Sequence, residues 1–336
     1  MKRFFYCIFS LLFISQISIS CEKDNIIEDF FIDNVVIDDS VQYNDSSNNQ
    51  SSNSEDETHK SKIHFTTKII GKGVIDVPSA NFKALPSGQG MAIFNQYMFR
   101  LHKTGICCIY DLSDINDIKY VNSYKLGSYN ASNHANCAQF DKNINPETGF
   151  PNLYVTVGYK ALPLGVEKVS LEQSELIQKI IPSNESGGMD RDWIIGDDGY
   201  LWGMGQSGKA GTESYKIVFY KLQTPDLSEK EVTINVENAV DYFEDDDEWQ
   251  NIPKTWQGGM VRNGKLYFLF GTKSVNRQIR IYDTKTHKRI AIIDLNQITK
   301  EEPEDLDIFD KDKIIMTLNG VDYAILFEFE NNELIP

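Results

Sequence analysis

Short apolar or alternating segments, separated by polar turns, fill the chain from residue 63 onward, and they have the length and pattern of β-strands. One group comprises residues 89–93, 97–101, 108–112 and 120–126. A second group, at 257–261, 266–270, 280–283 and 289–295, repeats its order of motifs. Turn sequences such as Arg262-Asn263-Gly264-Lys265 connect consecutive segments within a group. The pattern therefore predicts repeated units of four short antiparallel strands.

Three more units follow the same pattern. They comprise 135–140, 153–157, 165–171 and 176–181, then 192–196, 200–204, 217–222 and 231–235, and finally 305–309, 313–318 and 323–330. The last unit has only three strands, and the segment 63–71, which has no partner nearby in sequence, would supply the fourth. Such closure removes the exposed edges of a linear array. The predicted fold class is all-β, a single β-propeller of about five four-stranded blades closed by an N-terminal strand.

The insertion at 236–256 is long and acidic, and it leaves room for a sixth blade. Helical periodicity is nearly absent elsewhere, and the best candidate for a short helix is 236–249. The acidic run from Asp241 to Glu248 lacks the spaced alternation and turn glycine of a calcium-binding EF-hand loop. We therefore interpret it as a solvated surface loop.

The first 20 residues combine a positive start, a short apolar run and small residues just before Cys21. They resemble a bacterial lipoprotein signal peptide with Ser18-Ile19-Ser20-Cys21 as its lipobox. The resemblance implies removal of residues 1–20, lipid attachment at Cys21, and an outer-membrane lipoprotein that is surface-exposed or faces the periplasm. Glu22-Lys23-Asp24 resembles the surface-export signal of Bacteroidetes lipoproteins. The alternative is a secretory signal without lipidation.

Residues 21–62 are acidic and rich in serine and asparagine, and they include the short apolar patch 30–32. A segment of this composition buries too little apolar surface to offset its chain entropy, so we predict a disordered tether. The predicted organisation is a signal peptide at 1–20, a lipidated cysteine and tether at 21–62, and the propeller domain at 63–336.

A formal net charge of −16 makes nucleic acid an unfavourable partner, because phosphate binding depends on clustered lysine and arginine. Contact with the membrane is expected through the lipid on Cys21. Cys107, Cys108 and Cys137 are interpreted as small buried hydrophobic side chains, because their spacing does not match a metal site. A disulfide from Cys137 to Cys107 or Cys108 is the alternative in an oxidising compartment.

Three inner strands open with related motifs, Gln89-Gly90-Met91, Gln257-Gly258-Gly259-Met260 and Glu302-Pro303-Glu304-Asp305. In this respect residues 89–330 resemble the propeller domains of phage receptor-binding proteins, of teichoic-acid-related proteins and of many Bacteroidetes lipoproteins. The resemblance implies the fold and leaves the activity open.

Polar residues at the starts of the inner strands are expected to meet at one mouth of the central channel. The predicted ligand-binding residues are Gln89, His134, Asn136, Asp190, Arg191, Asp192, Gln257, Glu304 and Asp305. Amides, a histidine, an arginine and carboxylates are unfavourable to bury together without a ligand or ordered water. Trp193 and Trp256 adjoin this ring in sequence, and strand alternation favours core packing for both.

These residues favour a lipid-anchored cell-envelope protein that binds a carbohydrate or another cell-envelope ligand at the channel mouth. The first alternative is a glycan-cleaving hydrolase or lyase that uses Asp190 or Asp192 with Glu304, or His134. The second is a protein-interaction scaffold of an outer-membrane nutrient-uptake complex. No cofactor and no metal site are predicted, and the sequence leaves a structural cation in the channel open.

Overall fold

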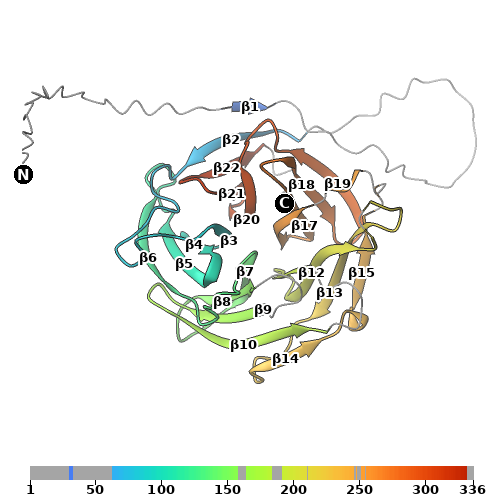
Figure 1. The fold of residues 1–336 in the computed structure, drawn as a ribbon, viewed down its shortest axis with the longest axis horizontal. Coiled ribbons are helices and arrows are strands. Elements are labelled where there is room, and N and C mark those ends of the chain that lie inside the picture. Colours follow the sequence, from blue (N-terminus) through green and yellow to red (C-terminus); the bar gives the residue numbers. More distant parts are fainter. Residues whose placement is uncertain are drawn as a thin grey trace, which may run out of the picture.

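Five small β-sheets surround a common centre and form the blades of the predicted propeller (Figure 1). The structure, a computed structural model, describes residues 30–32, 63–157, 164–183, 191–209, 211–245, 247, 251–253 and 255–330, with the backbone alone at 30–32 and 191. The predicted signal peptide, Cys21 and most of the tether lie outside the described residues, as does Asp190.

Blades 1 and 4 correspond to the two repeats that share the Gln-Gly motif, which confirms both predicted units. Blade 1 consists of β3 (Gly88–Phe94), β4 (Tyr97–His102), β5 (Ile106–Asp111) and β6 (Lys119–Lys125). Blade 4 consists of β16 (Trp256–Arg262), β17 (Lys265–Thr272), β18 (Val275–Asp283) and β19 (Lys288–Asp294). All their strand pairs are antiparallel.

One strand that the sequence pattern predicted for blade 3 belongs to blade 2. Blade 2 contains β7 (Ala138–Ile144), β8 (Pro151–Thr156), β9 (Leu164–Val169) and β10 (Ser174–Pro182). Blade 3 contains β11 (Arg191–Ile195), β12 (Tyr200–Ser207), β13 (Lys216–Gln223) and β15 (Asp241–Glu244). The segment 231–235, expected as the fourth strand of blade 3, forms β14 (Glu231–Ile234), which pairs parallel with β10 as a fifth strand of blade 2. The outer edge of β10 is thereby covered by a strand from the next unit of the chain.

The closing blade joins the two ends of the domain, as predicted. It contains β20 (Glu302–Asp310), β21 (Lys313–Asn319) and β22 (Ala324–Phe329), and β2 (Phe65–Ile70) pairs antiparallel with β22. A further strand, β1 (Phe30–Ile32), pairs with the outer edge of β2 (Figure 1). The ring is thus closed by backbone hydrogen bonds between chain segments more than 250 residues apart.

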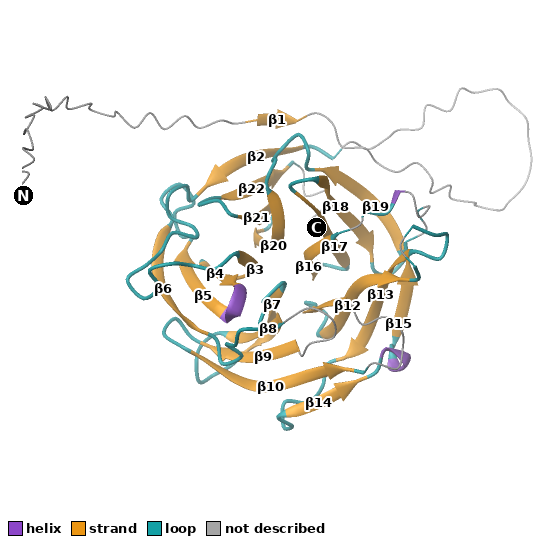
Figure 2. Ribbon diagram, in the orientation of Figure 1, coloured by secondary structure: helices purple, strands orange, loops and turns teal. Residues whose placement is uncertain are grey.

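In its described residues, 236–245, 247, 251–253 and 255–256, the acidic insertion contains neither the predicted α-helix nor a sixth blade. The 3-10 turn Val236–Asn238 is followed there by β15 (Figure 2). The interpretation as a solvated loop is also wrong at Asp245, which is buried and bonded to Arg280 and Arg289 at 2.7 and 2.9 Å. The two guanidinium groups lower the pKa of this carboxyl, although burial alone would raise it.

Hydrophobic clusters fill the spaces between adjacent blades, and the three cysteines belong to three different clusters. Cys107 packs between blades 1 and 2, Cys108 between the closing blade and blade 1, and Cys137 beside blades 3 and 4. All three are buried free thiols. This agrees with the interpretation as small hydrophobic side chains, and the alternative disulfide is not formed.

Candidate functional site

The inner strands β3, β7, β11, β16 and β20 follow one another around the central channel, and we call the end where they begin the channel mouth. Three of them, in adjacent blades, interrupt their pairing with a β-bulge close to this end. The irregular segments contain Gln89 with Gly90, Gln257 with Gly258, and Glu304. β-Bulges redirect side chains and occur often beside functional sites. The three related sequence motifs therefore mark the same structural position, at the mouth.

A chain of hydrogen bonds connects two of these bulges across three blades. Gln257 Nε2 donates to Glu302 Oε1 at 3.1 Å, and Asn319 Nδ2 donates to Glu302 Oε2 at 3.2 Å. Ser87 Oγ donates to Asn319 Oδ1 at 2.7 Å, and Gln89 Nε2 donates to Ser87 Oγ at 3.4 Å. The polar groups of this half of the mouth are thus held in fixed orientations by one another.

In this half of the mouth, Gln89 Oε1 has no hydrogen-bond donor among the described residues, and the Gln89 side chain is 2% exposed. Glu304 is also 2% exposed. Burial raises the pKa of Glu304 well above its usual range, and the nearby Arg100 opposes this only in part. Burial therefore favours the uncharged form of the Glu304 carboxyl.

The other half of the mouth is organised around Asp192 of β11. Asn136 Nδ2 donates to Asp192 Oδ2 at 2.8 Å, and the side chain of Trp256 also bonds to this carboxyl. Burial raises the pKa of Asp192 to about 7, although both hydrogen bonds favour the ionised form. Trp256 packs against the core as expected, yet it remains partly exposed beside this polar pair. Trp193 is buried, as predicted.

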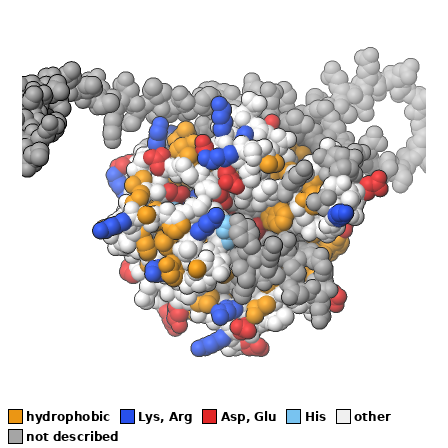
Figure 3. All heavy atoms as spheres, viewed as in Figure 1, with side chains coloured by type: hydrophobic (Ala, Val, Ile, Leu, Met, Phe, Trp, Pro, Cys, Tyr) orange, Lys and Arg blue, Asp and Glu red, His pale blue; other side chains and the backbone are white. Residues whose placement is uncertain are grey.

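His134 precedes β7 and is 8% exposed. Burial lowers the pKa of its imidazole to about 4, and the positive charge of Lys103 acts in the same direction. The ring is therefore neutral at physiological pH. Together with the side-chain amides, it contributes uncharged polar groups to the mouth. Figure 3 shows acidic, basic and histidine side chains close together at the centre of this face.

Asp305 has a structural role that its place in the predicted ring did not suggest. It is fully buried, and Oδ2 accepts hydrogen bonds from Met91 N at 2.8 Å and Ala138 N at 3.0 Å, while Oδ1 accepts from Leu306 N at 2.9 Å. These bonds connect the closing blade to blades 1 and 2 beneath the mouth. The backbone of Arg191 lies at the start of β11, and the position of Asp190 is not described.

The motif glycines allow the inner strands to approach one another at the axis. A Cβ atom on Gly90 would lie 2.7 Å from Ala135 O, and one on Gly258 would lie 2.2 Å from Asp305 Oδ1. Toward the opposite end, Arg262 of β16 bonds to Gln139 of β7, although these strands are not neighbours in the ring. The Arg262–Gln139 bond thus joins two non-adjacent inner strands across the axis.

Sequence reasoning missed Arg100, a fully buried arginine of β4 behind the mouth. Its guanidinium donates to Gln89 O, to Thr317 Oγ1 at 2.8 Å and to Leu318 O at 2.8 Å, and it pairs with Asp76 at 3.1 Å. It therefore connects the bulge of β3 to the closing blade. The available signal was a charged residue at an inward position of an otherwise apolar strand.

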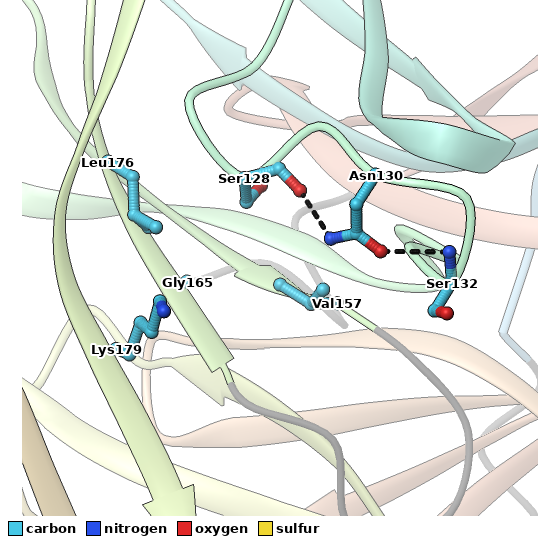
Figure 4. A pocket seen from close by; sticks show the side chains of 7 residues that line it. All are labelled: Ser128, Asn130, Ser132, Val157, Gly165, Leu176 and Lys179. Carbon is cyan, nitrogen blue, oxygen red and sulfur yellow. Dashed lines mark hydrogen bonds between the residues drawn. The ribbon is translucent and has the colours of Figure 1, made fainter.

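A separate cavity of about 160 Å³ lies between blade 2 and the β6–β7 connection (Figure 4). Its lining consists of Ser128, Asn130, Ser132, Val157, Gly165, Leu176 and Lys179. The amide of Asn130 is engaged by the loop itself, through Ser128 O at 2.9 Å and Ser132 N at 2.8 Å.

Across the described part of the chain, no group of three or more histidine, cysteine, aspartate or glutamate side chains is arranged to hold a metal ion. In the same residues, no helix has the length and apolar character needed to cross a membrane.

Comparison with known proteins gives a likeness in fold only. No protein-family model matches the sequence, and no curated protein matches it. Similar solved structures include a glutaminyl cyclase from Myxococcus xanthus, with 12% identity and a TM-score of 0.45 over 72% of this chain and 90% of that chain. A Trichoderma reesei carbohydrate-active enzyme of family AA12 has 8% identity and a TM-score of 0.42 over 79% of this chain and 96% of that one. A protein of unknown function from Bacteroides thetaiotaomicron has 9% identity and a TM-score of 0.39 over 80% and 77% of the two chains. At these values the likenesses carry no information about activity.

Proposed function

We propose that the protein is a lipid-anchored cell-envelope protein that binds a neutral, hydroxyl-rich ligand, such as a carbohydrate, at the channel mouth. The anchor follows from the lipoprotein-like sequence that ends at Cys21. The observation that carries the binding site is the set of three bulges, which bring Gln89, Gln257 and Glu304 to the same end of the channel.

The electrostatics of the mouth favour a neutral partner over an ion. Burial favours the protonated form of Glu304, His134 is uncharged, and Glu302 is already bonded by two amides. Gln89 Oε1 remains as a buried acceptor that a ligand hydroxyl could satisfy. Each such bond is worth about 0.5–1.5 kcal/mol net, and leaving a buried partner unmet costs about 1–3 kcal/mol.

The test is binding of the purified full chain to an array of plant, host and bacterial glycans, followed by calorimetry with the strongest binder. Gln89→Met removes the free acceptor at nearly constant volume, and Glu304→Met removes both polar atoms of the carboxyl at similar volume. Each should weaken binding about 5- to 150-fold, the equivalent of about 1–3 kcal/mol. The matched control, Glu147→Gln, changes an exposed carboxylate in the β7–β8 turn and should leave the affinity unchanged.

Unchanged affinity in both mouth variants would overturn the proposed site. If the folded chain binds no glycan, the alternative of a protein-interaction scaffold gains support instead.

Glycan cleavage is the second candidate, and it is favoured by one observation. Asp192 and Glu304 both have raised pKa values, as a general acid at neutral pH requires. Incubation of the bound glycan with the wild-type chain, with release of reducing ends or unsaturated sugars as the readout, separates cleavage from binding. Asp192→Asn and Glu304→Gln should each abolish product release if these residues supply the proton.

A further inference from the structure

The outer edge of each blade exposes backbone groups that could pair with another chain, and proteins protect such edges by covering or charging them. The edge of β10 is covered by β14. Beside β6, Asn81 Nδ2 donates to Ser123 O at 2.9 Å. The outermost strands β15 and β19 carry charged residues, namely Asp241 and Glu244 in one and Lys288, Arg289 and Asp294 in the other.

The edge of β2 has little protection of its own. Its sequence Phe-Thr-Thr-Lys-Ile-Ile contains one charge, Lys68, among residues of high β-propensity. Ile69 is 41% exposed on this strand. A strand with these properties favours strand addition.

The covering strand comes from the N-terminal segment of the same chain. Phe30 pairs with Thr67, Phe31 with Thr66 and Ile32 with Phe65, in antiparallel register. Phe30-Phe31-Ile32 is an apolar patch in an otherwise acidic segment, which suits pairing with a β-rich edge. In Figure 1, β1 lies along the outside of β2.

We propose that Phe30–Ile32 is a built-in edge strand that caps β2 and fastens the N-terminal segment to the closing blade. Only residues 22–29 then separate Cys21 from the domain. At 3.3–3.6 Å per residue these span about 30 Å at most, whereas residues 22–62, if unpaired, could extend well over 100 Å. The outer edge of the closing blade is therefore the surface that faces the lipid, and the channel mouth opens to the side. This last step rests on the proposed lipid anchor.

Paired cysteines test the strand register in the full chain. Phe31→Cys with Thr66→Cys, and Phe30→Cys with Thr67→Cys, place cysteines directly opposite each other. Because hydrogen-bonded and non-hydrogen-bonded pairs alternate in an antiparallel ladder, one of the two has the closer side chains. Trypsin should place residue 31 in the peptide 24–60 and residue 66 in the peptide 63–68, neither of which contains a native cysteine. Mass spectrometry without reduction then detects the linked peptides.

The matched control joins Phe31→Cys to Ile69→Cys, an exposed position three residues out of register. We expect a disulfide in most molecules for at least one in-register pair, and in few molecules for the control. Equal yields in all pairs would show random collision and overturn the proposal, as would no disulfide in either in-register pair. A link between two copies of the chain at position 66 would identify β2 as a dimer edge and also overturn it.

Energy transfer tests the membrane-facing surface independently. The lipidated chain is placed in vesicles that carry an acceptor lipid, with a fluorophore attached either to Ile69→Cys or to Leu227→Cys. Leu227 lies across the ring from Ile69, near β14. The efficiency of energy transfer to the acceptor lipid is measured for each. Both positions are exposed. Transfer should be greater from position 69, and equal transfer would refute the orientation. A chain that does not bind the vesicles would refute the lipid anchor alone, because the cysteine-pair experiment does not depend on it.

Discussion

Replacement of Asp76 by asparagine should destabilise the closed ring through Arg100. The Arg100 side chain is 0% exposed and Asp76 is 11% exposed, at a separation of 3.1 Å. Removing one partner of a buried ion pair costs about 3–5 kcal/mol, because the remaining charge stays desolvated. Arg100 keeps acceptors on Gln89, Thr317 and Leu318, so we expect the lower end, about 3 kcal/mol.

Urea unfolding followed by tryptophan fluorescence measures this effect. With a slope of about 3 kcal/mol/M, Asp76→Asn should lower the midpoint by about 1 M. The matched control, Asp117→Asn, removes the same charge from an exposed pair with Lys119 and should shift the midpoint little. In an Arg100→Met background the effect of Asp76→Asn should largely disappear, since no buried charge is left unpaired. Equal midpoint shifts for Asp76→Asn and Asp117→Asn would refute the reasoning.

Three further predictions concern packing, protonation and the thiols. Gly258→Ala would place a methyl group 2.2 Å from Asp305 Oδ1 and should lower the stability measured in thermal unfolding by about 1–3 kcal/mol. The control Gly165→Ala meets only side-chain carbons at 3.3 Å or more and should lower it less. Equal losses of stability would contradict the close approach at the axis. Because burial raises the pKa of Asp192 from 3.8 to about 7, the folded chain retains a proton that the unfolded chain loses, so its contribution to stability falls as pH rises from about 4 to 7. In the wild-type chain, this group should lower the free energy of unfolding by up to ~4 kcal/mol between pH 4 and pH 7, and Asp192→Asn should remove that decrease. Urea unfolding at several pH values measures it, and an unchanged pH dependence in the variant would argue against the raised pKa. Burial raises the pKa of Cys108 to about 12. The buried thiols of Cys107, Cys108 and Cys137 should therefore resist iodoacetamide at pH 8 until the chain is unfolded. Peptide mass spectrometry of the treated native chain should find all three unmodified.

Glu304 and Asp305 show how far the candidate site could be predicted. Sequence position placed both at the channel mouth. A bulge separates their positions: Glu304 lies in the irregular segment, whereas Asp305 accepts backbone hydrogen bonds from two other blades. Bulges depend on the pairing of two strands, so a single strand sequence does not reveal them.

Arg100 and Asp245 illustrate the same limit for charged residues. The sequence alone does not show whether a charged side chain, in an apolar strand or in an acidic run, is exposed to solvent or buried in an ion pair. Each is buried here because a partner distant in sequence lies opposite, Asp76 for the first and Arg280 with Arg289 for the second. Pairing of this kind depends on how the blades pack.

The sequence by itself determined the four-stranded unit of the fold and the closing role of residues 63–71, and it indicated about five blades while leaving room for a sixth. Alternating apolar positions record which side chains face the core, and this local signal survives without knowledge of the partners. Only the tertiary structure decided that β14 joins blade 2, that β15 completes blade 3 and that β1 covers β2. The backbone hydrogen-bonding groups at a strand edge are nearly the same for every sequence. Which strand pairs with which therefore depends on the edges that lie next to one another once the ring is closed.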